Sequence, residues 1–230
     1  VFTATSTGSG GAIPGFFHGA IGIILSVLDS SEPAYINYGN GKVARFAWNF
    51  NPEKNVVMEI IESIGYTGTI QNLNNLNSLT SLYLQNNSLS GTLPTADTDN
   101  LQNLDASFNR LTGAVPNMTA AGSSLVTLYL NNNLLDTYNE SSLNQNTSLS
   151  KVYLQNNRLT FQALGNLLRD LITMAASGNS AEVKLEGNGA TGVSIQAMNN
   201  DPNKENDGSH LKMFTQLTTS DGFSITIDQN

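Results

Sequence analysis

The side chains that most often perform catalysis or bind metals are sparse in this sequence and poorly spaced for either task. The two histidines, His18 and His210, have no neighbours at the spacing of a metal site or a catalytic triad. Cysteine is absent, which excludes disulfides and thiolate metal sites. His18 follows Phe17 in an apolar context, where a structural histidine is the more common case. We therefore expect no metal or catalytic centre around either histidine.

The segment 201–208, DPNKENDG, superficially resembles a calcium-binding loop. Such a loop needs glycine at its sixth position and a closing glutamate. Here the sixth position is Asn206 and no glutamate closes the loop, so we interpret the segment as a solvated acidic loop. A glycine-rich phosphate loop, a nucleophile elbow and a spaced carboxylate pair are also missing. The sequence therefore predicts neither an enzyme nor a cofactor.

Charge is scarce and predominantly negative. Charged residues make up 12% of the chain and the net charge is −8, whereas nucleic-acid binding normally needs a basic face. The longest apolar run near the start covers only residues 20–28, and a membrane-spanning helix needs about 20 apolar residues. We expect a core strand or short helix there, no membrane span and no nucleic-acid partner.

The elements that would position a binding site come from a repeat in the centre of the chain. The pattern L-x-x-L-x-L-x-x-N-x-L begins at Leu79, Leu101, Leu125 and Leu149, and a weaker copy begins at Val183. The sequence thereby resembles a leucine-rich repeat protein, and its copies have the usual period of that family. The resemblance implies an α/β, β-rich solenoid with a parallel concave sheet and about five to six coils.

One asparagine per copy is expected to face into the solenoid. Each copy supplies a short strand whose alternate side chains enter the core, after which the chain turns and leaves backbone groups unpaired. An inward amide donates and accepts hydrogen bonds, so stacked asparagines satisfy these groups. We assign this structural ladder to Asn87, Asn109, Asn133, Asn157 and Asn188.

Between the copies, the return segments change character along the chain. Residues 89–94 (LSGTLP) and 111–116 (LTGAVP) resemble the plant-type L-x-G-x-[IL]-P turn, which the third and fourth copies lack. In the fourth copy, residues 161–176 have apolar side chains at helical spacing. A convex-side helix there would explain why the last two ladder asparagines are farther apart in sequence than the others.

The two ends of the chain are expected to cap the solenoid. Residues 34–50 predict a hairpin whose Tyr-Gly-Asn-Gly turn is similar to a hairpin preceding leucine-rich repeats in bacterial surface proteins and bacteriophage virion proteins. Residues 211–227 predict a helix, a turn and a last strand. We divide the chain into an arm (1–30), a hairpin cap (31–56), the solenoid (57–195) and a C-terminal cap (196–230). The arm is either a flexible linker or a segment that orders on a partner.

Outward strand positions of the concave face form columns that a partner would contact. One column is Tyr83, Asp105, Tyr129, Tyr153 and Lys184, and the next is Gln85, Ser107, Asn131, Gln155 and Glu186. Tyrosines beside amides suit glycans or uncharged protein surfaces; alternatively, they only solubilise a β-surface. The predicted binding residues are Tyr83, Gln85, Asp105, Tyr129, Asn131, Tyr153 and Gln155. A third column lies at the strand edge and contains Asn86, Phe108, Asn132, Asn156 and Gly187.

Two functions fit this pattern. The first is a non-catalytic recognition or adhesion module on a bacterial cell or virion surface that binds protein or glycan through the concave face. The second is a structural bacteriophage virion protein, such as a capsid decoration or fibre-like component, assembled into the particle through residues 1–30. An immune-type receptor ectodomain is a third interpretation, and the missing capping cysteines count against it.

Overall fold

The computed structural model describes residues 79–93, 100–119, 124–188, 194–202, 206 and 209–228, and before them the backbone of five strands. Their bounds are β1 (Thr3–Thr5), β2 (Ala34–Asn37), β3 (Val43–Phe46), β4 (Val56–Glu59) and β5 (Thr67–Thr69). β2 pairs antiparallel with both β1 and β3. The predicted turn at residues 39–41 and the arm apart from β1 lie outside the described residues.

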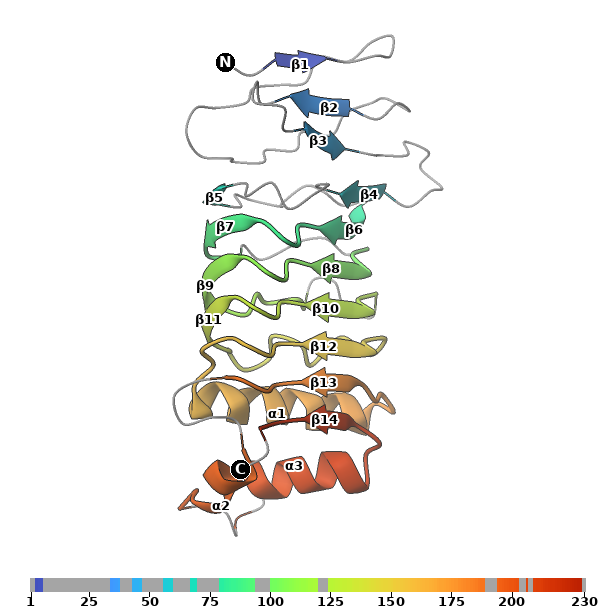
Figure 1. Cartoon of the computed structure of the whole chain (residues 1–230). Helices are drawn as coiled ribbons and strands as arrows, with labels where there is room; N and C mark the ends of the chain where they lie inside the picture. The colour runs from blue at the N-terminus through green and yellow to red at the C-terminus, as the bar shows by residue number, and fades with distance from the viewer. Residues whose placement is uncertain are drawn as a thin grey trace.

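One strand from each coil joins a seven-stranded parallel sheet (Figure 1). Equivalent leucine-rich positions are aligned across it: Leu82 pairs with Leu104, Leu104 with Leu128, and Leu128 with Val152. The sheet order is β14-β13-β12-β10-β8-β6-β4. Its new members are β6 (Leu79–Tyr83), β8 (Asn103–Asp105), β10 (Thr127–Tyr129), β12 (Lys151–Tyr153), β13 (Glu182–Lys184) and β14 (Ser224–Thr226).

A second parallel sheet lies on the other side of the coils (Figure 1). It has the order β11-β9-β7-β5, with β7 (Ser88–Gly91), β9 (Arg110–Ala114) and β11 (Leu134–Thr137). Gly91 and Gly113, the glycines of the L-x-G turns, have φ angles of 79° and 78°. Side chains rarely adopt this left-handed conformation, so the turn favours glycine at both positions.

The repeat leucines fill the space between the two sheets. Leu82, Leu104 and Leu128 are buried on the inner face of the seven-stranded sheet, and Leu111 and Leu135 are buried on the side of the second sheet. Burying one leucine side chain contributes about 1.5–3 kcal/mol. Each coil depends on its neighbours for this burial, because a single coil has no second layer of its own. The predicted α/β, β-rich solenoid is therefore confirmed.

Helices replace the second sheet in the last coils. Helix α1 spans Phe161–Ala176, which confirms the helix predicted from the spacing of its leucines. The Thr160 side chain caps it by accepting a hydrogen bond from the backbone N–H of Ala163. The longer sequence separation of the last two ladder asparagines comes from this helix. Two further helices, α2 (Ile195–Asn199) and α3 (His210–Thr219), precede β14.

Candidate interaction face

The ladder asparagines tie each coil to the preceding one. The Asn133 Nδ2 donates to the carbonyl oxygens of Leu130, at 3.0 Å, and of Ala106 in the preceding coil, at 2.9 Å. Its Oδ1 accepts from the Leu111 N–H at 3.0 Å. One amide thus serves backbone groups of two coils that would otherwise be buried without partners. The same contacts recur at Asn109, Asn157 and Asn188, and Asn87 donates within its own coil.

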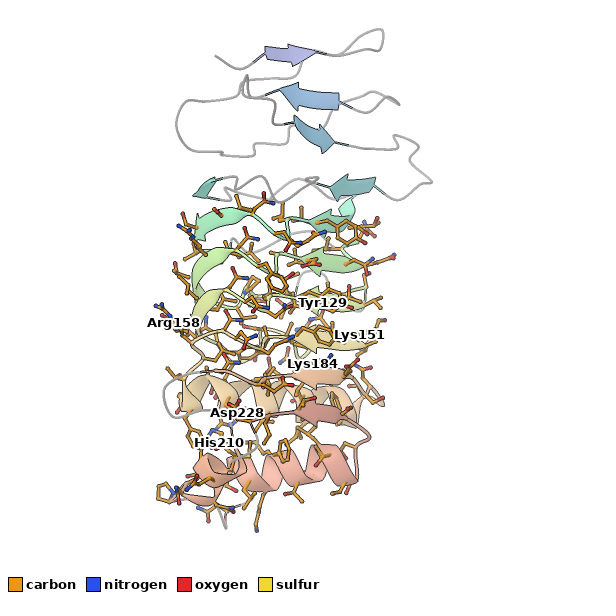
Figure 2. All side chains as sticks on the ribbon, in the orientation of Figure 1. Tyr129, Lys151, Arg158, Lys184, His210 and Asp228 are labelled. Atoms are coloured by element: carbon orange, nitrogen blue, oxygen red, sulfur yellow. The ribbon has the colours of Figure 1, made fainter. Side chains whose placement is uncertain are left out.

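The tyrosine column, consisting of Tyr83, Asp105, Tyr129, Tyr153 and Lys184, is continuous in space. Each member is the register partner of the next across β6, β8, β10, β12 and β13. All five side chains are half-buried, since the outer face of the sheet is not covered by another layer in the described part of the chain. Figure 2 shows Tyr129 and Lys184 on this side, with Arg158 on the side of the second sheet.

The C-terminal end of the tyrosine column is held together by side-chain contacts. The rings of Tyr129 and Tyr153 lie 4.7 Å apart between centroids, tilted by 35°. The Lys184 Nζ lies 4.3 Å from the Tyr153 ring centroid and 3.3 Å from the Glu182 carboxylate. Because β12 lies between β10 and β13, one face of Tyr153 is covered by Tyr129 and the other by Lys184. The ring therefore presents its edge and hydroxyl outward.

These contacts set the protonation states on the face. Burial, followed by the negative charges around it, raises the pKa of Tyr129, so its hydroxyl remains a hydrogen-bond donor at neutral pH. A hydrogen bond from Tyr153 is the main cause that lowers the pKa of Glu182. A hydrogen bond to Glu182 is the main cause that raises the pKa of Lys184. The face thus offers the neutral Tyr129 hydroxyl beside the Glu182–Lys184 ion pair.

A polar ladder runs beside the tyrosine column. The Asn103 amide donates to the Ser81 hydroxyl at 3.2 Å and accepts from the Thr127 hydroxyl at 2.8 Å. At the end of the same strand, β8, Asp105 accepts hydrogen bonds from the backbone N–H of Ser107, at 3.0 Å, and from the Ser107 hydroxyl, at 2.6 Å. These bonds orient the polar groups before any partner arrives, which lowers the entropy that binding would lose.

The amide column, consisting of Gln85, Ser107, Asn131, Gln155 and Glu186, is less uniform. Asn131 is only 8% exposed and Ser107 is also buried, because their side chains are shorter than the flanking glutamines. Side-chain oxygens of Gln85, Gln155 and Glu186 are buried without a hydrogen-bond donor from the described residues. The accessible part of the predicted site therefore centres on the tyrosine column, with Asn131 beneath the surface.

Comparison with known proteins agrees with this geometry. Residues 78–97, the first full copy of the pattern, match the family model described as Leucine Rich Repeat. The chain therefore carries a leucine-rich repeat. Comparison with curated proteins gives no match. The match supports a general role in protein interaction. The asparagine ladder and the columns show that the coils after the matched residues have the same repeat geometry.

A third line of repeat residues, the left-handed column, runs along the edge of the face. Its members are Asn86, Phe108, Asn132, Asn156 and Gly187, and their φ angles are 58°, 54°, 57°, 56° and 69°. The Asn156 Nδ2 donates to the Asn132 Oδ1 at 3.0 Å. A Cβ at Gly187 would clash with the Asn156 side chain, so any other residue there would require that amide to move and would also adopt an unfavourable backbone conformation. The sequence predicts this column, and its shared backbone conformation becomes visible only in the structure.

The repeat structure also brings together two residues that the sequence did not connect. The His210 Nδ1 lies 2.8 Å from the Asp201 Oδ2, and its ring lies 3.9 Å from the Phe161 ring between centroids. The His210 Nε2 is buried against Gly165 of α1 and has no hydrogen-bond partner among the described residues. Because Nε2 is buried, it is not accessible to a substrate as a base. The His210–Asp201 pair instead contributes to the packing of α3 against α1. His18 lies outside the described residues.

The described residues show two further absences. They contain no group of three or more His, Asp or Glu side chains arranged to share a metal ion. Among the same residues, no helix combines the length and the apolar character needed to cross a bilayer.

Proposed function

We propose that this chain is a non-catalytic recognition module that binds a protein through the outer face of its seven-stranded sheet. Leucine-rich repeats serve in general as protein-interaction modules. The contact residues that we propose are Tyr83, Asp105, Tyr129 and Tyr153, with Gln85 and Gln155 at their side. The observation that carries the proposal is the stacking of Tyr153 between Tyr129 and Lys184.

This stacking favours a protein over a glycan. A sugar ring binds aromatic side chains mainly by packing on an exposed ring face, whereas both faces of Tyr153 are covered. What remains available are ring edges, hydroxyls and amides, which suit the polar and aromatic contacts of protein interfaces. The mixed charges of Asp105, Glu182 and Lys184 provide no large field of one sign, so long-range attraction contributes little.

The location that we propose is a bacterial cell surface or a virion surface. Support comes from the resemblance of the predicted hairpin at residues 34–50 to a hairpin of bacterial surface and bacteriophage virion proteins, and from the cysteine-free, weakly charged composition of the chain. In a virion, residues 1–30 would attach the chain to the particle. Limited proteolysis tests this role: protection of residues 1–30 in an assembled particle supports it, and cleavage there at the rate of the isolated chain contradicts it.

Random peptides displayed on phage and selected on the full chain supply a defined probe for the binding face. We expect selected peptides to lose at least about tenfold in affinity for the Tyr129→Ala, Tyr153→Ala variant, since aromatic interface residues commonly contribute 1.4 kcal/mol or more. Arg158→Ala is the control, because Arg158 lies on the side of the second sheet (Figure 2). Unchanged affinity of the tyrosine variant, or binding confined to a glycan array, would overturn the proposal.

A further inference from the structure

Phe108 occupies a backbone conformation that the equivalent positions reserve for asparagine or glycine. The left-handed column has φ angles between 54° and 69° in all five coils, and Phe108 has the lowest of these values. Asparagine tolerates this region because its short amide hydrogen-bonds locally, and glycine has no Cβ to clash. A bulky ring gains neither advantage. Phenylalanine at position 108 is therefore locally unfavourable for the fold.

The Phe108 side chain does not compensate by burial. It is 51% exposed, and it is the one exposed large hydrophobic side chain among the described residues whose burial is known. It also lacks the amide that links Asn156 to Asn132 in the same column. A single exposed hydrophobic residue is ordinary on a protein surface. Exposure combined with an unfavourable backbone conformation points instead to a functional constraint.

The backbone around Phe108 is held firmly. Its N–H donates to the Asn131 carbonyl oxygen at 3.0 Å, and the next residue, Asn109, donates to the Asn132 carbonyl oxygen at 3.2 Å. From the other side, the Asn86 N–H donates to the Ser107 carbonyl oxygen at 3.1 Å. Coils on both sides thus fix the position from which the ring projects. Because this backbone is already ordered, binding through the ring would cost little backbone entropy.

We infer that Phe108 is the apolar anchor of the interface, inserting into an apolar pocket of the protein partner. This inference rests on the proposed function and specifies the chemistry of the partner surface that contacts the Phe108 ring. The residues beside the ring, Asn86, Ser107 and Asn132, are uncharged, so the pocket of the partner is apolar with a rim of neutral hydrogen-bonding groups. Contact at this point depends little on salt, because screening acts on charges.

The test uses Phe108→Asn in the full chain, which installs the residue found at three equivalent positions. We expect its Tm to equal or exceed that of the parent, because asparagine suits the left-handed backbone. Peptides selected from the random phage library on the parent chain should bind the variant at least about tenfold more weakly. Phe108→Tyr, which keeps the ring, should stay within about threefold, and Asn156→Gly, in the same column two coils away, within about twofold.

The outcomes separate this inference from the proposed function. If Phe108→Asn binds the peptides normally while the Tyr129→Ala, Tyr153→Ala variant does not, Phe108 is no anchor and the binding face stands. If neither variant loses affinity, or no peptide is enriched, both proposals fail. A fall in Tm of more than about 4 °C for Phe108→Asn would assign the ring to packing and overturn the inference.

Discussion

The hydroxyl of Tyr138 donates a hydrogen bond of 2.7 Å to the carboxylate of Asp170, deep between helix α1 and the preceding loop. Asp170 is only 4% exposed and also accepts hydrogen bonds from the backbone N–H groups of Ser141 and Leu143, both at 2.9 Å. Ser141 has a φ angle of 64°. One buried carboxylate thus fixes the loop that leads from the repeats with a second sheet to the repeats with helices.

Tyr138 should make stability sensitive to alkaline pH. Burial, followed by the charge of Asp170, raises the pKa of the Tyr138 hydroxyl well above its ordinary value near 10. Below pH 10 this tyrosine is protonated in both folded and unfolded chains; above pH 10 only the unfolded chain loses the proton. The free energy of unfolding therefore falls by up to about 1.4 kcal/mol per pH unit from this group.

Urea denaturation of the parent and Tyr138→Phe between pH 8 and pH 11 measures this contribution. We expect the variant to be less stable at pH 8 by about 1.5–3 kcal/mol, since it loses a hydrogen bond to a charged group. Its stability should then decline less steeply above pH 10. Parallel declines of the two proteins would show that Tyr138 does not titrate differently on unfolding.

Mutations of the neighbouring residues Asn132 and Asn133 should change the free energy of unfolding by very different amounts. Asn133→Ala removes the acceptor of the Leu111 N–H, so we expect a loss of about 1–3 kcal/mol in the free energy of unfolding. Asn132→Gly keeps the left-handed backbone accessible and loses only an exposed hydrogen bond with Asn156, so the change should stay within about 0.5 kcal/mol. Chemical denaturation gives both values, and similar values for the two variants would contradict the inside–outside assignment.

The repeated coils are the part of the fold that sequence reasoning reaches best. Leu82, Leu104 and Leu128 recur at fixed offsets, and stacking requires equivalent positions to become register partners. The sequence therefore predicts the tyrosine column as well as the core. It does not indicate that Asn131 is buried, because burial depends on the relative lengths of neighbouring side chains.

Other features depend on contacts or conformations that no periodic pattern reports. His210 and Asp201 meet because α2 and α3 fold back on α1, and nothing in their spacing predicts this. The left-handed column gives only a weak signal, namely Asn86, Asn132, Asn156 and Gly187 at one repeat position. Phe108 obscures that signal in the second copy. Only the φ angle of Phe108 shows that this residue shares the left-handed conformation of the asparagines and the glycine in the column.

A glycine inside helix α1 is required for the contact with α3. In an exposed helix, replacing glycine with alanine adds about 1 kcal/mol of stability. At Gly165, however, a Cβ would clash with the His210 ring, so we expect Gly165→Ala to lower the free energy of unfolding by about 1–3 kcal/mol.

Adding His210→Ala to Gly165→Ala makes room for the new methyl group and should restore part of this loss, giving a nonzero coupling in the double-mutant cycle. Gln162→Ala, on the exposed side of the same helix, is the control and should change stability by less than about 0.5 kcal/mol. An increase in stability for Gly165→Ala alone would show that α1 and α3 do not pack as described.

The pKa of the Glu182 carboxyl reports on the electrostatics of the proposed binding face. A hydrogen bond from Tyr153 is the largest cause that lowers the pKa of Glu182, and Lys184 acts in the same direction. Both favour the carboxylate over the neutral acid, so removing either should raise this pKa toward its ordinary value. We expect Tyr153→Phe to raise it more than Lys184→Met, as followed by carbon NMR of the labelled carboxyl during an acid titration. Lys151→Met, on the same face, should have a smaller effect, since the Lys151 charge is the weakest of these causes. A larger shift for Lys184→Met than for Tyr153→Phe would mean that the Glu182–Lys184 ion pair, and not the hydroxyl of the stacked tyrosine, organises this end of the face.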